Sequence, residues 1–412
     1  MGHPPRRQFA ELLPALKGFA RWLPIALAVG ATTGAAVTLF MWGLDFVTAY
    51  RELHPLIILG LPVAAAAVAW FYARYGATVE AGNNMILEEI HEPRKVVPAR
   101  LGPLILLSTW TMHLFGASVG REGTAVQMGG SLADQLTWIL RLPSTDRRRL
   151  LMAGMSAGFA AVFGTPLAGA IFGLEVLAIG RLEYEGLLSC FIAAWAGNAF
   201  AHFLGIHHAA YPLVTVLHPT WVGTAWAVAT GAAFGLTGSG FAWATHAVSD
   251  VLRRTLRQTW LRPFVAGVVV VALAAVLQST RYLGLGVEVI QESFTHALPL
   301  RDSLLKALFS VISLGSGMKG GEVTPLFFIG ATLGSALSAY LPLATGVLAA
   351  LGFVAVFAGA ANTPLACTLM GIELFGSGAS LYLGLACVAS YVFSGHAGIY
   401  RAQKIGRPKL GV

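Results

Sequence analysis

The sequence predicts an all-α membrane protein whose helices are often tilted or broken and are arranged in two related halves. The chain has 412 residues, of which 56% are hydrophobic and only 11% are charged. An ordinary soluble domain carries charge on about a quarter of its residues. The composition therefore excludes a water-soluble protein. A segment that crosses lipid must satisfy its own backbone groups, which favours helices, and an internal repeat predicts the two halves.

Four stretches without Asp, Glu, Lys or Arg supply expected membrane-spanning helices, at 55–73, 101–120, 263–280 and 323–372. Each is near or beyond the ~20 residues that cross the hydrocarbon core as a helix. The 48 Gly and 19 Pro residues are scattered through the apolar runs, so many helices should be short or interrupted. Backbone groups freed at an interruption must face protein or a cavity. The interruptions are therefore candidate sites.

The charged residues and the cysteines indicate how the protein sits in the membrane and which ligands it is not expected to bind. The first 22 residues alternate apolar and basic residues, which predicts an interfacial helix rather than a cleavable signal peptide. Basic ends place both termini on the cytoplasmic side. Despite a net charge of +8, the basic residues form small clusters between apolar segments, which indicates contact with membrane lipid and not with nucleic acid. The three cysteines lack metal-ligand spacing, so we predict no metal and no cofactor.

Two segments of the chain repeat one another. Thr165 begins TPLAGAIFGLEVL and Thr363 begins TPLACTLMGIELF, 198 residues later, while GREGT at 120–124 and GGEVT at 320–324 keep nearly the same spacing. Paired interrupted segments of this kind indicate a transporter with a site near the middle of the membrane. We predict a single transport domain over 1–412, with halves of about 20–205 and 220–406 and no regulatory domain at the carboxyl end. Small residues can also recur simply because membrane helices pack closely, and the sequence leaves a parallel or inverted relation open.

The first interruption, ASVGREGTAVQMGG at 117–130, places Glu122 at the start of a predicted helix. Backbone N–H groups at a helix start are unsatisfied and attract anions. The Glu122 carboxylate can occupy that position, and on protonation it can leave to admit an anion. The alternative is a capping residue paired with Arg121. A carboxylate inside a membrane is by default a functional candidate.

The second interruption, SLGSGMKGGEVTP at 313–325, provides a second helix start, with Pro325 in its first turn. Two such starts converging from the two halves would enclose one anion. Glu322 is unexpected there, because a second carboxylate repels anions unless it is protonated or paired. It is either a proton carrier or the partner of Lys319 in a structural ion pair.

Two further segments offer hydrogen-bond donors. GNNMI at 82–86 contains Asn83 and Asn84, whose side-chain amides suit a compact anion, although either residue could be an ordinary helix cap. FSGHAGIY at 393–400 ends in Tyr400, whose hydroxyl could donate to an anion, and an aromatic residue at the membrane interface is the alternative.

At these residues the chain resembles the CLC family of anion channels and transporters, in which the same motifs occur in the same order. The resemblance implies two inverted halves of tilted helices, assembled as a homodimer with one pore per subunit. It also implies that Glu122 is the external gate and Tyr400 the inner-gate tyrosine. Chloride-transporting members usually have a serine where this chain has Asn83, proline at Thr124, and Gly-x-Phe-x-Pro where it has Gly-Glu-Val-Thr-Pro.

Together these departures resemble the fluoride-specific branch of the family, proton-coupled exporters of the bacterial inner membrane. The resemblance associates Asn83, Glu322 and Thr324 with fluoride handling. Fluoride is small and strongly hydrated, so its release from water requires strong donors. We predict that fluoride and protons are the transported ions and that Glu122 and Glu322 couple them. The predicted anion site consists of Asn83, Gly120, Arg121, Gly123, Val323, Thr324 and Tyr400.

One departure bears on the proton route. Chloride exchangers carry two successive carboxylates after the first TPLA segment, the second being a proton relay, whereas this chain has Glu175 and Val176. We hypothesise that Glu322 supplies the inner part of the route. A chloride/proton exchanger or a passive chloride channel of the same fold is the alternative. An intramembrane enzyme would need a nucleophile–base pair or a metal-binding HExxH motif, and neither is present, so we predict no catalytic residues.

Overall fold

In this computed structural model, the backbone is described for residues 5–212, 214 and 218–411, and the side chains from residue 12 onward. That part contains sixteen α-helices, short 3-10 turns, and a two-stranded parallel pairing of β1 (Ala178–Ile179) with β2 (Lys404–Ile405). The first eight helices are α1 (Pro5–Leu53), α2 (Leu61–Tyr75), α3 (Asn83–His91), α4 (Leu101–Leu114), α5 (Glu122–Ile139), α6 (Ser144–Phe163), α7 (Pro166–Glu175) and α8 (Leu187–Phe203).

The remaining helices belong to the second half of the chain. They are α9 (Trp221–Thr255), α10 (Leu261–Val276), α11 (Val287–Glu292), α12 (Leu300–Gly315), α13 (Val323–Leu337), α14 (Thr345–Ala361), α15 (Pro364–Phe375) and α16 (Ser380–Phe393). The expectation of an all-α protein with many interrupted helices is confirmed. The uncharged stretch at 323–372, for instance, is divided among α13, α14 and most of α15.

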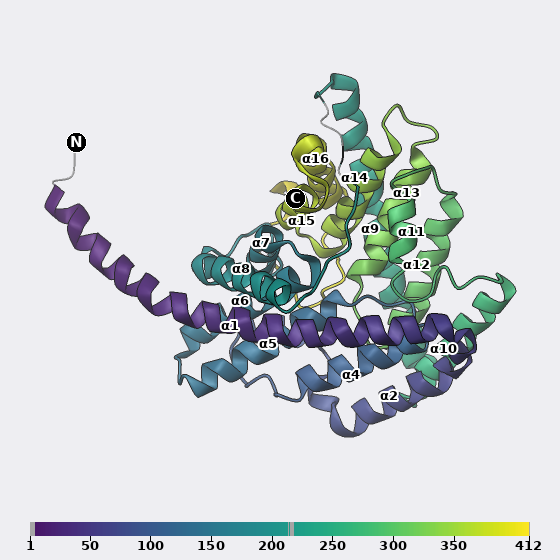
Figure 1. The fold of residues 1–412 in the computed structure, drawn as a ribbon, viewed down its shortest axis with the longest axis horizontal. Coiled ribbons are helices and arrows are strands. Elements are labelled where there is room, and N and C mark those ends of the chain that lie inside the picture. Colours follow the sequence, from purple (N-terminus) through teal and green to yellow (C-terminus); the bar gives the residue numbers. More distant parts are fainter. Residues whose placement is uncertain (1–4, 213, 215–217, 412) are drawn as a thin grey trace.

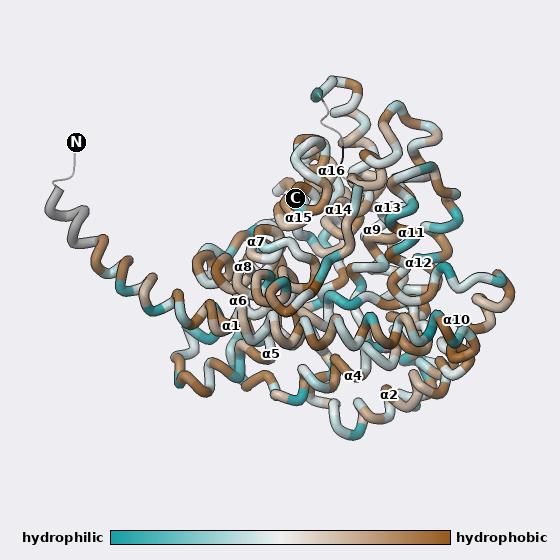
Figure 2. The backbone as a smooth tube through the Cα atoms, in the orientation of Figure 1, coloured by the Kyte–Doolittle hydropathy of each residue, from teal (hydrophilic) through white to brown (hydrophobic). Residues whose placement is uncertain are grey.

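Helix length separates two kinds of element. Within the described residues, three helical segments are long and apolar enough to cross a membrane, namely Leu12–Leu53, Pro55–Tyr75 and Tyr184–Phe203. Seven further apolar helices have only 10–17 residues. Apolar side chains such as Trp42, Phe46, Trp70 and Val276 are exposed on the outer helices, and apolar residues line much of α1, α2 and α10 (Figure 2). These surfaces suit contact with lipid.

Helix α1 is one continuous element where the sequence predicts an interfacial helix followed by a span. It runs along one side of the molecule, and its first turns project beyond the other helices (Figure 1). Pro14 and Pro24 both lie inside it. Its later part packs against α6 and α8, so it covers the first half of the repeat.

Glycine pairs allow the central helices to approach closely, in the same way in both halves. A Cβ atom on Gly129 of α5 would lie 2.1 Å from the carbonyl oxygen of Gly154 of α6. In the second half, a Cβ atom on Gly330 of α13 would lie 2.0 Å from the carbonyl oxygen of Gly352 of α14. Small residues at such crossings permit backbone contact in membrane proteins. The repeat therefore extends from sequence motifs to helix packing.

We expect Gly154→Ala to lower the stability of the protein. Its new Cβ atom would lie 2.3 Å from the Gly129 carbonyl oxygen and 2.6 Å from the Ala133 Cβ atom, and overpacking of this kind costs about 1–3 kcal/mol or more. Thermal unfolding in detergent measures the effect. Gly240→Ala in α9 is the control, because nothing lies within 4 Å of its Cβ position. Equal melting temperatures for the two variants would contradict the close crossing.

Each of the two TPLA helices, α7 and α15, carries a carboxylate that caps the start of the other helix. Glu175, at the end of α7, accepts backbone N–H bonds of 3.0 and 2.8 Å from the start of α15. Glu373, near the end of α15, accepts bonds of 2.9 and 2.8 Å from the start of α7. A carboxylate satisfies the free N–H groups and the positive end of a helix. Each half thus caps a helix of the other half.

Candidate anion site at two helix starts

The starts of α5 and α13 meet at an antiparallel bridge between two glycines. The Gly120 N–H donates to the Gly321 carbonyl at 2.6 Å, and the Gly321 N–H donates to the Gly120 carbonyl at 2.8 Å. A Cβ atom on Gly120 would lie 2.9 Å from the Gly321 oxygen and 2.7 Å from a Glu122 carboxylate oxygen. Only glycine allows this approach. The bridge between Gly120 and Gly321, 201 residues apart in sequence, brings the two expected interruptions to one place.

Glu122 lies between the two helix starts, with only 1% of the residue exposed. Its Oε2 atom accepts the backbone N–H of Arg121 at 3.1 Å and the backbone N–H of Thr324 at 3.2 Å. Its Oε1 atom accepts the Thr324 hydroxyl. The carboxylate therefore occupies a position formed by hydrogen-bond donors of both halves, the Arg121 N–H and the Thr324 N–H and hydroxyl, which we call the Glu122 seat. Arg121 is also near, with its Nε atom 3.8 Å from Oε1.

The remaining backbone groups of the predicted site surround this seat. Gly123 lies in the first turn of α5, and a Cβ atom there would be 3.2 Å from the Asn83 side-chain nitrogen. Val323 is the first residue of α13 and is buried. The Gly120 N–H donates to the Gly321 carbonyl. In this structure Gly120 therefore allows the two helix starts to approach each other closely. The anion-binding roles of these residues stay predictions.

A polar cavity of about 260 Å³ lies next to the seat, and Asn83, Glu322 and Tyr400 all line it. Asn83 is the first residue of α3, and its Oδ1 atom is buried without a hydrogen-bond partner. Tyr400 is 7% exposed, and its ring packs edge-on against Phe172 with centroids 6.4 Å apart. The three side chains that the sequence singled out from distant segments thus face one space.

Glu322 stands immediately before α13 on the wall of this cavity. The alternative in which it pairs with Lys319 is not formed, because no ion pair within 4 Å joins these two described residues. The Lys319 ammonium lies instead over the Tyr72 ring, 4.2 Å from its centroid. Glu322 therefore does not form the structural ion pair with Lys319, which was the alternative to a role as a proton carrier.

The segment that carries Tyr400 is fixed by two side-chain amides, Asn84, which the sequence offered as a hydrogen-bond donor to an anion, and Gln403, which it did not mark. The Asn84 side chain accepts the backbone N–H of Ala402 at 3.0 Å, so Asn84 anchors this segment. The Gln403 side chain donates to the carbonyls of Val176 at 3.0 Å and Ala361 at 3.1 Å. No local motif marks Gln403, because its partners are far away in sequence.

Gln127 is a second residue that the sequence analysis missed. It lies on α5, one turn beyond Glu122, and lines the polar cavity. A Cβ atom on Gly82, whose φ is +54°, would lie 2.9 Å from the Gln127 Oε1 atom, so glycine there lets α3 begin beside this amide. An amide side chain about five residues after Glu122, within the buried part of α5, was the available signal.

Together the fold and the site define an integral membrane protein that handles anions. The family model described as voltage gated chloride channel matches residues 63–395. The chain belongs to this family, the CLC family of chloride and fluoride transporters and channels, whose members are not enzymes.

Two relatives with names show which members of this family the chain is similar to in sequence. The chain is 51% identical over 405 residues to a chloride/fluoride channel protein of Pseudomonas syringae pv. tomato, covering 97% of this chain and 90% of the relative. It is 25% identical over 384 residues to the H(+)/Cl(−) exchange transporter ClcA of Vibrio vulnificus, covering 85% of this chain and 81% of that one.

Solved structures confirm the CLC fold. A crystal structure of a CLC-type fluoride/proton antiporter is similar with a TM-score of 0.91 and 34% identity, covering 94% of this chain and 98% of that one. A eukaryotic CLC transporter is similar with a TM-score of 0.73 and 19% identity, covering 94% of this chain and 74% of that one. The resemblance to the fluoride branch, inferred from three motif departures, agrees with the first of these similarities.

Proposed function

We propose that this protein is a fluoride/proton antiporter that exports fluoride from the cytoplasm across the bacterial inner membrane. The observation that carries the proposal is the Glu122 carboxylate, buried in a seat of donors from α5 and α13. In the proposed assembly, residues 1–412 form one transport domain, with halves of about 20–205 and 220–406. Two copies form a homodimer with both termini in the cytoplasm.

Exchange follows from the chemistry of the seat. The ionised Glu122 carboxylate satisfies the N–H groups of Arg121 and Thr324, so no other anion can take the position. A protonated carboxyl carries no charge and accepts these bonds less strongly. It can then leave the seat to an anion, carrying its proton with it. Return of the ionised carboxylate expels the anion, so one site alternates between the side chain and the transported ion.

The donor set favours fluoride over chloride. Fluoride loses strong hydration when it enters a buried site, and strong hydrogen bonds must replace that hydration. The Thr324 hydroxyl already contacts the seat, and Asn83 and Tyr400 line the adjoining cavity. The names of two relatives support this choice, because one is a chloride/fluoride channel protein and the other a CLC-type fluoride/proton antiporter.

Glu322 completes the proposed proton route. Val176 stands at the position where the resemblance to chloride exchangers places a second carboxylate, and Val176 is fully buried. Glu322 offers a carboxylate on the cavity that also contains Tyr400. Protons would therefore pass between Glu122 and the cytoplasm by way of Glu322.

Flux from reconstituted vesicles tests the proposal. We expect vesicles loaded with fluoride to release it rapidly and to take up protons as they do so. An imposed pH gradient should drive this release. Chloride-loaded vesicles should release little chloride. A chloride/proton exchanger, which the similarity to ClcA makes the second candidate, predicts proton-coupled chloride release. Fluoride release that ignores the pH gradient would indicate a passive channel and would reject antiport.

A further inference from the structure

A basic pocket adjoins the polar cavity on a wall that does not include Glu122. A second, smaller cavity of about 60 Å³ shares its lining with the first. The shared residues come from the end of α2, the turn after it, the far part of α9 and the segment before α13: Tyr72, Glu80, Ser249, Arg253, Gly317 and Lys319. Lys319 and Arg253 therefore line the same cavity as Asn83 and Tyr400.

Lys319 is a cation without a matching anion. Its ammonium lies 4.2 Å from the centroid of the Tyr72 ring, and among the described residues no carboxylate lies within 4 Å of it. Glu80 faces the same pocket without forming such an ion pair. A cation held against an aromatic face keeps most of its positive charge available, because this attraction is weak. A lysine ammonium is also compact and strongly hydrated, which suits a hydrated anion.

Tyr72 contributes a second and independent sign of a ligand. The residue is only 4% exposed, it lines both cavities, and its hydroxyl is buried without a hydrogen-bond partner. A buried hydroxyl normally finds a partner, and an anion beside Lys319 would accept its hydrogen.

The side-chain charges that line the polar cavity and those that line a larger cavity near Arg121 sum to opposite signs. The cavity that contains Lys319 has three basic side chains, Lys319, Arg253 and Arg401, against the carboxylates Glu80 and Glu322. A cavity of about 990 Å³ that includes Arg121 has three arginines against four carboxylates: Arg51, Arg121, Arg281, Asp45, Glu52, Glu288 and Glu292.

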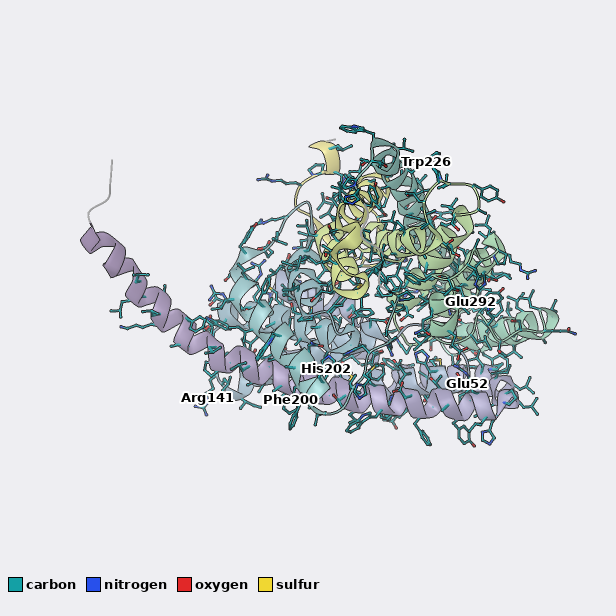
Figure 3. The ribbon with its side chains drawn as sticks, turned by 45° about the horizontal axis from the view of Figure 1, so that its top comes forward. Glu52, Arg141, Phe200, His202, Trp226 and Glu292 are labelled. Carbon is teal, nitrogen blue, oxygen red and sulfur yellow. The ribbon has the colours of Figure 1, made fainter. Side chains whose placement is uncertain are left out.

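Glu52 and Glu292 of the larger cavity lie on the same side of the molecule (Figure 3). A net positive mouth concentrates anions and a net negative mouth does not. Anions are thus drawn to the cavity next to Tyr400.

We propose that Lys319, Tyr72 and Arg253 form an anion-capture site, where a hydrated fluoride ion is held before it loses its water at Asn83 and Thr324. The inference rests on the proposed function for the identity of the ion and for the cytoplasmic position of this mouth. The ammonium and guanidinium attract the ion, and the tyrosine hydroxyl donates to it. The site raises the local fluoride concentration at the entrance and takes no part in proton transfer.

The site is tested by the fluoride dependence of transport in vesicles. For Lys319→Met and Arg253→Gln we expect the fluoride KM to rise by about tenfold, within the range of electrostatic steering, with kcat and the ratio of protons to fluoride unchanged. Tyr72→Phe should raise KM less. An added impermeant salt screens these charges and should raise the fluoride KM of the wild type. The same salt should raise the KM of the two charge variants less, because one of the screened charges is already absent.

Arg254→Gln is the matched control, since Arg254 is the exposed neighbour of Arg253 and lines neither cavity. Lys319→Arg should restore the wild-type KM if the charge is what matters. Wild-type KM and salt dependence in Lys319→Met and Arg253→Gln would overturn the capture site while leaving fluoride transport intact. If the wild type carried only chloride, the proposed function would fail, and the same comparison of chloride KM values would decide the capture site separately.

Discussion

Glu122→Gln is expected to abolish proton-coupled fluoride transport. Glutamine keeps the size of the side chain and its amide oxygen still accepts hydrogen bonds in the seat, but the amide neither binds nor releases a proton at physiological pH. Its NH₂ group would also face the donors that now bind the carboxylate, the N–H groups of Arg121 and Thr324. We expect proton flux to fall roughly 100-fold or more, in the range seen when a positioned proton carrier is lost.

The measurement records fluoride with an electrode and protons with a pH-sensitive dye in the same vesicles. Glu88→Gln is the control, because Glu88 is exposed and has no ion pair among the described residues. The control should transport like the wild type. Normal coupled flux in Glu122→Gln would remove Glu122 from the proton pathway and with it the exchange of side chain and anion in one seat.

The second large effect is expected for Glu322→Gln, which should uncouple proton movement from fluoride release. The Glu322 side chain faces the polar cavity and forms no ion pair with Lys319, so glutamine removes the charge without breaking a structural contact. Coupled proton flux should fall at least tenfold, since removal of a positioned proton carrier costs about 10²–10⁴-fold. Simultaneous recording of the two ions gives the coupling ratio.

Glu322→Asp separates proton transfer from packing. Aspartate keeps an ionisable carboxyl on a shorter side chain, so it should retain part of the coupled flux that glutamine loses. An unaltered proton-to-fluoride ratio in Glu322→Gln would place the inner proton route elsewhere. Equal losses in the aspartate and glutamine variants would point to a role in packing instead.

The two helix starts were predictable because local sequence determines them, and their meeting was predictable from the repeat that relates them. Glycines before Glu122 and Thr324 interrupt apolar runs, and the matched spacing of the two interruptions places them in equivalent positions of the two halves. The side-chain amide of Asn83 and the hydroxyl of Tyr400 were predictable from residue type in the same way. The structure places both on one cavity.

Contacts between distant segments could not be predicted from local pattern. The Lys319 side chain turns toward Tyr72 and away from Glu322, although spacing alone allowed an ion pair. Gln403 was missed because its partners, Val176 and Ala361, precede it by more than forty residues. The continuous helix α1 differs from the expected interfacial helix followed by a separate span, because its helical backbone runs unbroken through Pro14 and Pro24.

The reciprocal capping by Glu175 and Glu373 means that neither half of the chain is complete alone. A separated half would expose one unsatisfied helix start and bury one carboxylate with no partner. Two copies of an identical half could exchange these groups equally well, each supplying what the other lacks. The starts of α7 and α15 therefore depend on one another, because each is satisfied only when the carboxylate of the other helix is in place.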